Sequence, residues 1–92
     1  MHKEMRNITE IELKLQLLRY NILSKRESTA AYTCLQTGEN MYHNAEWSEC
    51  VNEMLEIDRE LLSYGYGLTC TGIKTTDEIQ YRVYKIIPAS DN

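Results

Sequence analysis

Residues 45–64, with the sequence AEWSECVNEMLEIDRELLSY, decide the fold because they carry the clearest helical pattern in the chain. Their apolar side chains recur at spacings of three and four residues, as on one face of an α-helix. Asn44 is suited to cap the start, and Gly65 is suited to follow the last turn. The predicted apolar face comprises Trp47, Cys50, Val51, Met54, Leu55, Ile57, Leu61 and Leu62. We therefore predict that this helix organises the core.

Five glutamates share the opposite side of this predicted helix, because they also recur at spacings of three and four residues. They are Glu46, Glu49, Glu53, Glu56 and Glu60. Only Arg59 lies close enough in the sequence to neutralise them. The simpler interpretation is a solvated helix face. The functional hypothesis is a docking surface for a protein with a basic surface, because carboxylates one helical turn apart resemble a row of phosphates.

Residues 9–26 carry a second helical pattern. Thr9 and Glu12 have the spacing of a capping box. Four aliphatic side chains fall within an arc of roughly 60° on one side of this helix. They are Ile11, Leu15, Leu18 and Ile22. Residues 11–17 also alternate as a strand would, but Leu, Lys, Glu and Gln favour a helix, so we predict one from Thr9 to Arg26.

A second apolar cluster, Leu13, Leu17 and Tyr20, lies on the far side of the same predicted helix. A helix that is apolar on two sides is either enclosed by the fold or covered by another molecule. Full enclosure is difficult in a domain of 92 residues. We therefore take these three residues as a candidate patch for a dimer or partner contact.

Residues 28–43 allow two interpretations. As a hairpin, residues 30–36 pair with residues 41–43 across a turn at residues 37–40. As a helix, Ser28 caps the start and Gly38 follows the end. The Thr and Tyr residues of this stretch favour strands. We therefore prefer the hairpin and leave the helix open.

The C-terminal part predicts two strands, residues 66–73 and 79–87, with Pro88 ending the pairing. The expected fold is α+β, with two main helices packed on a small antiparallel sheet in the order α-β-β-α-β-β. The alternative is a winged-helix-like arrangement of three helices and a C-terminal β-hairpin. Either way we expect one domain over residues 1–92, with residues 1–7 and 89–92 frayed.

Charge and cysteine content narrow the function classes. The net charge is −4: residues 1–45 carry six basic against five acidic side chains, and residues 46–92 carry four against nine. The acidic second half argues against a nucleic-acid grip there, because phosphate contacts supply most of that affinity. Cys34, Cys50 and Cys70 are an odd number without a CxxC pair. With no signal peptide and no long apolar run, we expect free thiols in the cytoplasm and no membrane contact.

Catalytic and cofactor motifs are missing from the sequence. The cysteines and His43 lack zinc-site spacing, and residues 65–67 lack the remainder of a phosphate-binding loop. Asp58 falls within the apolar face, where we expect a structural partner such as Arg82, Lys85 or a tyrosine hydroxyl. We therefore predict a protein that is not an enzyme and has no cofactor and no metal.

The favoured function is a small non-catalytic interaction protein, expected to be a homodimer, that binds and modulates or inhibits another protein. Small accessory or phage-type regulators offer an analogy for this class. The alternative is a nucleic-acid-binding regulator that uses a wing or sheet with Lys74, Arg82 and Lys85.

Overall fold

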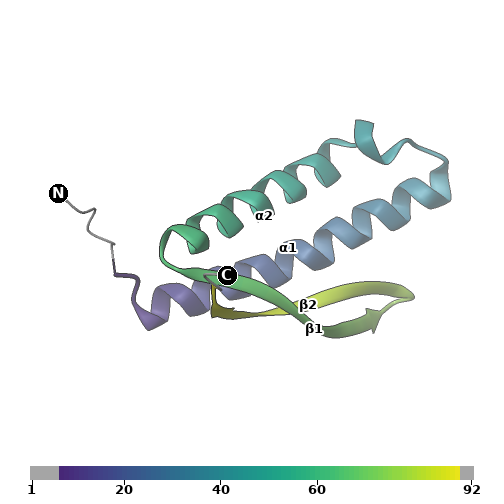
Figure 1. The fold of residues 1–92 in the computed structure, drawn as a ribbon. Coiled ribbons are helices and arrows are strands. Elements are labelled where there is room, and N and C mark those ends of the chain that lie inside the picture. The colour runs from purple at the N-terminus through teal and green to yellow at the C-terminus, as the bar shows by residue number, and fades with distance from the viewer. Residues whose placement is uncertain (1–6, 90–92) are drawn as a thin grey trace.

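The structure is a computed structural model that describes residues 7–89 of the chain. Its elements are helix α1 (Glu10–Thr37), the short 3-10 helix η1 (Met41–His43), helix α2 (Ala45–Ser63), strand β1 (Tyr66–Thr76) and strand β2 (Ile79–Pro88). The two helices run antiparallel, and the β1–β2 hairpin packs on another side of α1 (Figure 1). This confirms the expected α+β class with two main helices on an antiparallel sheet.

The predicted first hairpin is wrong, because α1 continues without a break through residues 28–37. The threonines of this stretch, whose β-branched side chains favour strands, have hydrogen-bond partners inside the helix: Thr29 donates to the Lys25 carbonyl at 2.8 Å, and Thr33 donates to the Thr29 carbonyl at 3.0 Å. Ala30 is buried on the inner face of α1. Tertiary packing thus outweighs the strand preference of this stretch.

The helical alternative for this stretch is correct, since residues 28–37 are part of α1. It also predicts the end of the helix, because Gly38 follows α1 with a left-handed φ of 78°. Ser28 lies within α1 and caps nothing. Because one long helix replaces two, the described residues contain two α-helices, and the winged-helix alternative is wrong as well.

Both predicted helix starts are confirmed. Thr9 Oγ1 accepts from the Glu12 backbone N–H at 3.1 Å, and Glu12 Oε1 accepts from the Thr9 backbone N–H at 3.0 Å, which is a complete capping box. Asn44 Oδ1 accepts from the Trp47 backbone N–H at 2.9 Å and so caps α2. Gly65 follows α2 with a φ of 90°. These local signals are strong because each satisfies a backbone group that the helix itself leaves unpaired.

The C-terminal hairpin is longer than expected. The turn is only Asp77 and Glu78, which have φ values of 53° and 69°, as in the tight turns that match the twist of paired strands. The pairing register shifts between Cys70 and Gly72, which agrees with a bulge at that glycine. Of the ends expected to fray, residues 1–6 and 90–92 lie outside the described part of the chain.

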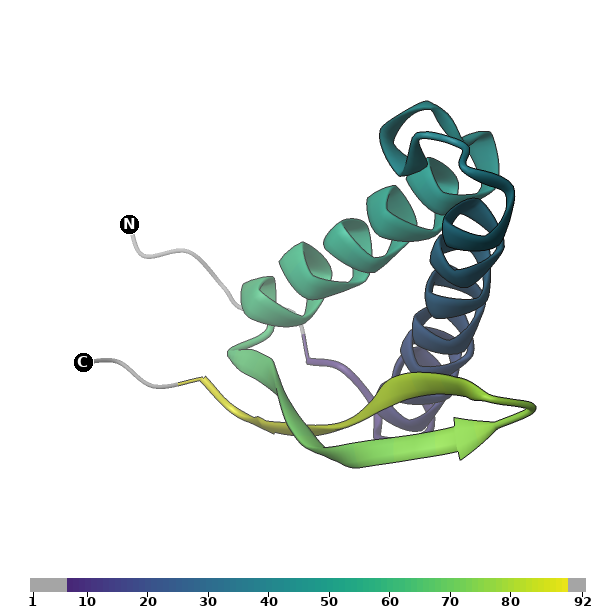
Figure 2. The same cartoon turned by 90° about the vertical axis from the view of Figure 1, so that its right-hand side faces the viewer.

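The core lies where α1, α2 and the hairpin meet. Viewed along α1, helix α2 and the hairpin occupy two different sides of it (Figure 2). Two polar side chains of α1 bind the β2 backbone: Asn21 pairs with both the N–H (2.8 Å) and the carbonyl (3.2 Å) of Tyr84, and Ser24 donates to the Arg82 carbonyl at 2.8 Å. The buried cluster is Leu23, Cys50, Ile57 and Leu61.

Candidate partner-binding surfaces

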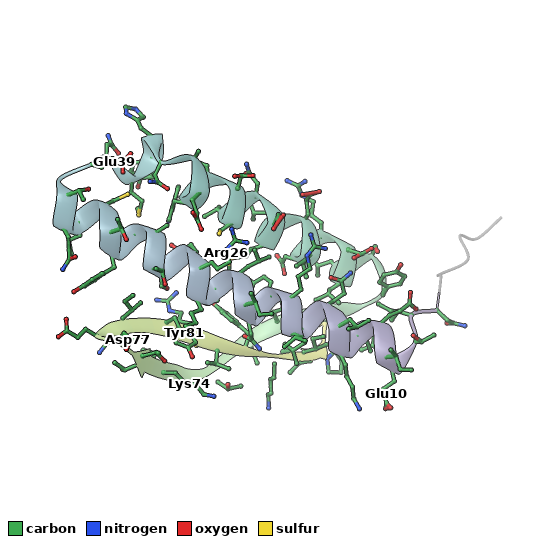
Figure 3. The ribbon with its side chains drawn as sticks, turned by 180° about the vertical axis from the view of Figure 1, so that it is seen from behind. Glu10, Arg26, Glu39, Lys74, Asp77 and Tyr81 are labelled. Carbon is green, nitrogen blue, oxygen red and sulfur yellow. The ribbon has the colours of Figure 1, made fainter. Side chains whose placement is uncertain are left out.

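The acidic stripe of α2, defined as Glu46, Glu49, Glu53, Glu56 and Glu60, borders α1 along part of its length. Glu46 pairs with Arg26 at 3.3 Å, and Glu53 pairs with Arg19 at 3.8 Å. Figure 3 shows Arg26 between the two helices. Its hydrogen bond to Glu46 raises the pKa of the Arg26 guanidinium. Because both pairs are exposed to solvent, each adds little to stability. Because of these two ion pairs, two of the five glutamates already have a cationic partner within the fold.

A third member of the stripe is also tied to α1, since Glu60 accepts from the Gln16 amide at 2.6 Å. A hollow of about 350 Å³ opens beside it, and Ile57 contributes to its lining. The charged lining residues are Arg19, Glu53, Glu56, Arg59 and Glu60. The hollow therefore offers carboxylates and an aliphatic side chain to the same ligand group.

Glu49 and Glu56 are the outward members of the stripe. Both are exposed, and neither makes a hydrogen bond or ion pair with any residue between 7 and 89. The stripe as a whole has three arginines beside it, Arg19, Arg26 and Arg59, so its five carboxylates are only partly compensated. The charge that remains is concentrated at Glu49 and Glu56.

Leu13, Leu17 and Tyr20, which we expected to form a contact patch on α1, are not an exposed surface in the structure. Leu13 and Tyr20 pack against the core cluster, and Leu17 is half-buried. The inner side of α1 is thus the side that carries Leu13 and Tyr20. A single helix pattern does not reveal which of two apolar sides turns inward, because that depends on where the hairpin docks.

The outer side of α1 instead carries the four aliphatic side chains that share one arc of the helix. Their exposed fractions are 70% for Ile11, 58% for Leu15, 57% for Leu18 and 51% for Ile22. We call these four residues the outer stripe. The sequence pattern reveals the set but not its exposure. The available signal was its spacing of four, three and four residues, which is that of a coiled-coil seam.

A groove lies between α2 and the hairpin, with α1 as its floor. Two hollows of about 290 and 180 Å³ adjoin each other there, since Glu27 and Met54 line both. Glu27 is held in place by the Trp47 indole, which donates to its Oε2 at 2.7 Å. The groove is open and mixed in polarity, so it is a less specific candidate surface than the acidic stripe.

Tyr84 lines the first of these hollows and Tyr20 the second, and their rings meet edge to face with centroids 4.9 Å apart. Burial, with smaller contributions from Tyr84 and Asp58, raises the pKa of Tyr20 to about 12. Asp58 is half-buried, and in the described part of the chain it pairs with neither Arg82 nor Lys85. Neither of the two expected ion pairs is therefore formed there. Asp58 lies near the third expected kind of partner, a tyrosine, since it lines the same hollow as Tyr20 and its charge contributes to the raised pKa of that phenol.

The nucleophilic and metal-binding side chains are dispersed. Cys34 and Cys50 are buried, and burial raises the pKa of both thiols, which disfavours the reactive thiolate. Cys70 is exposed on β1. Within residues 7–89 no three His, Cys, Asp or Glu side chains are grouped closely enough to hold a metal ion. Across the same residues, neither helix combines the length and apolar character required to cross a membrane.

Comparison of the chain with protein-family models, with curated proteins and with solved structures gives no match. The functional interpretation therefore depends on the surfaces of the fold itself. Of these, the acidic stripe and the outer stripe stand out, because each concentrates one kind of side chain on one exposed side of a helix.

Proposed function

We propose that the protein is a non-catalytic binding module that docks a second protein with a basic surface on the acidic stripe of α2, and thereby modulates or inhibits it. The observation that carries this proposal is the exposure of Glu49 and Glu56 without a cation from the rest of residues 7–89. Lysine or arginine side chains of a partner would supply the missing charge, and the adjacent hollow offers room for one of them.

A protein partner suits this surface better than a nucleic acid. The carboxylates of the stripe repel phosphates. The hairpin carries the basic side chains Lys74, Arg82 and Lys85, but its turn also carries the acidic Asp77 and Glu78. The hairpin therefore lacks the concentrated positive charge that nucleic-acid binding requires.

We also propose that the protein works in the cytoplasm, because of its free cysteines. Its three cysteines are free in the structure, including the exposed Cys70. Free thiols persist in reducing compartments, whereas an oxidising compartment favours their pairing.

The test is an affinity purification from cells that express the protein, followed by mass spectrometry and repeated with the double variant E49Q/E56Q. This variant removes the two uncompensated charges and leaves the Arg19 and Arg26 ion pairs in place. We expect a specific partner of the wild type to be lost, and its binding to weaken as salt screens the charges.

The matched control is E10Q/E78Q, which makes the same chemical change at two exposed glutamates away from the stripe; a glutamine at position 78 can still accept the 3.3 Å hydrogen bond that the Tyr32 hydroxyl donates to Glu78. It should retain the partner, and both variants should melt like the wild type. Equal retention of the partner by both variants would remove the stripe from the proposal. DNA or RNA binding at low salt, measured by fluorescence anisotropy, would favour the nucleic-acid alternative instead.

A further inference from the structure

The outer stripe of α1 is an apolar surface that no described element covers. Figure 3 looks onto α1 from behind, with α2 above it and the hairpin below it, and neither crosses its front. Each of the four side chains is more than half exposed. From Ile11 to Ile22 the stripe extends along the helix for about 17 Å. An aliphatic surface of this regularity is typical of a helix that packs against a second helix.

The symmetric spacing of the stripe suits pairing with a second copy of α1. Steps of four, three and four residues are the same in both directions, and so is the order Ile, Leu, Leu, Ile. We propose that two copies of the chain pair through this stripe with their α1 helices antiparallel about a two-fold axis. Ile11 then meets Ile22 of the second copy, and Leu15 meets Leu18 of the second copy. A self-complementary patch is what a two-fold dimer requires.

The charged residues beside the stripe favour the antiparallel direction. Glu12 follows Ile11, and Arg19 follows Leu18, each at the position that flanks the seam. In the antiparallel pair, Glu12 of one copy lies beside Arg19 of the other, so opposite charges meet twice. Within each copy Glu12 also caps α1 and Arg19 also lies 3.8 Å from Glu53, so both groups would share their charge between two contacts. In a parallel pair, Lys14 would lie beside Arg19 of the second copy, and like charges would meet twice. The charge pattern therefore selects one of the two directions.

The apolar character of the seam ends after Ile22. The next two seam positions along α1 are Lys25 and Thr29, both exposed and polar. Lys25 lies instead over the ring of Tyr81, 5.7 Å from its centroid. The contact is thus confined to the first half of α1, and a short interface of this kind predicts a dimer that dissociates on dilution.

This inference does not depend on the proposed function, because the acidic stripe lies on α2. The first test is sedimentation velocity over a range of concentrations. The wild type should reach twice the 10.8 kDa mass of one chain. The variant L15K/L18K places four lysines at the centre of the interface and should raise the dimer dissociation constant by at least about 100-fold.

The matched control for this variant is L35K, since Leu35 is 82% exposed on the same helix but outside the stripe. It should dimerise like the wild type. Circular dichroism should show all three proteins equally folded, because every substituted side chain is exposed. A wild type that stays monomeric at all concentrations would overturn the proposal, as would a dimer that L15K/L18K leaves intact. A monomer that binds anionic vesicles through the stripe would overturn it in favour of a lipid surface.

The second test determines direction by disulfide formation and does not need a charge variant. In a C70S background, proteins carrying I11C and I22C are mixed and oxidised. The antiparallel pair brings these two positions together, whereas two copies of position 11 are about 17 Å apart, beyond the reach of a disulfide. Mixed I11C–I22C dimers should therefore form in preference to I11C homodimers. Efficient I11C homodimers would show a parallel pair and would contradict the proposal.

Discussion

Tyr20 shows how one side chain links the three elements of the fold. It lies on α1, contacts the Tyr84 ring of β2, and lines a hollow with Asp58 of α2. Burial, aided by these two neighbours, raises the pKa of its phenol to about 12, so the folded protein holds this proton more tightly than the unfolded chain does. Tyr20 therefore packs in the core as a neutral group.

The raised pKa of Tyr20 predicts a loss of stability at alkaline pH. Its contribution is complete below pH 10, the ordinary pKa of the group, and is lost as the pH rises toward about 12. Urea unfolding at several pH values should show the free energy of unfolding falling more steeply over this range for the wild type than for Y20F. The variant keeps the ring and removes the titrating hydroxyl. Identical slopes for the two proteins would show that Tyr20 ionises freely in the folded state.

At the scale of single residues the sequence was a reliable guide. Thr9, Asn44 and Gly65 mark helix ends in both the pattern and the structure, and Gly38 does so in the helical alternative for residues 28–43. A cap needs only a side chain and the backbone within a few residues of it, so the local sequence contains the whole interaction. Ser28 and Asp58 are exceptions: Ser28 lies inside the continuous α1, and the surroundings of Asp58 are set by α1 and not by its own helix α2.

At the scale of elements, α1 is the main difference between expectation and structure. Its second half combines threonines that prefer strands with alanines that prefer helices. The contacts that decide between them come from α2, which lies against the inner face of α1 and contributes Cys50 to the core. The two residues of such a contact lie far apart in the sequence, so the local pattern of residues 28–43 favours the hairpin and leaves the continuous helix as the alternative.

The continuity of α1 predicts the effect of a proline at Ala31. Within a helix the change removes a hydrogen bond and introduces a clash, so A31P should lower the free energy of unfolding by about 3 kcal/mol or more. The control is A45P, because Ala45 is the first residue of α2 and proline fits that position. Urea unfolding of both variants measures the difference. Similar stabilities for A31P and A45P would mean that residues 28–37 are not helical.

At the scale of the whole molecule, the fold leaves two different surfaces on two helices. α2 and the hairpin pack on two adjoining sides of α1 (Figure 2), where Leu13 and Tyr20 contact the core cluster, and the outer stripe of α1 is left exposed. α2 keeps its uncompensated charge at Glu49 and Glu56. A dimer through the first surface would leave the second one available in both copies, which would give the proposed module two docking sites per assembly.

The candidate surfaces were predictable from the sequence only as patterns. The five glutamates of α2 share one stripe as expected, but their ion pairs with Arg19 and Arg26 depend on the antiparallel packing of the two helices. The two apolar sides of α1 were likewise visible, and the hairpin decides which one is inside. The sequence pattern shows which residues share one side of a helix, and tertiary packing decides which side is buried.

The orientation of α1 decides which of its two apolar sides is exposed, and one comparison tests it most directly. L13A and L15A make the same change on opposite sides of the helix, and urea unfolding at concentrations too low for association gives the stability of each. Because Leu13 packs on the core and Leu15 is mostly exposed, L13A should lower the free energy of unfolding by about 1–3 kcal/mol and L15A by less than about 0.5 kcal/mol. A larger loss for L15A than for L13A would contradict this orientation and, with it, the exposed outer stripe.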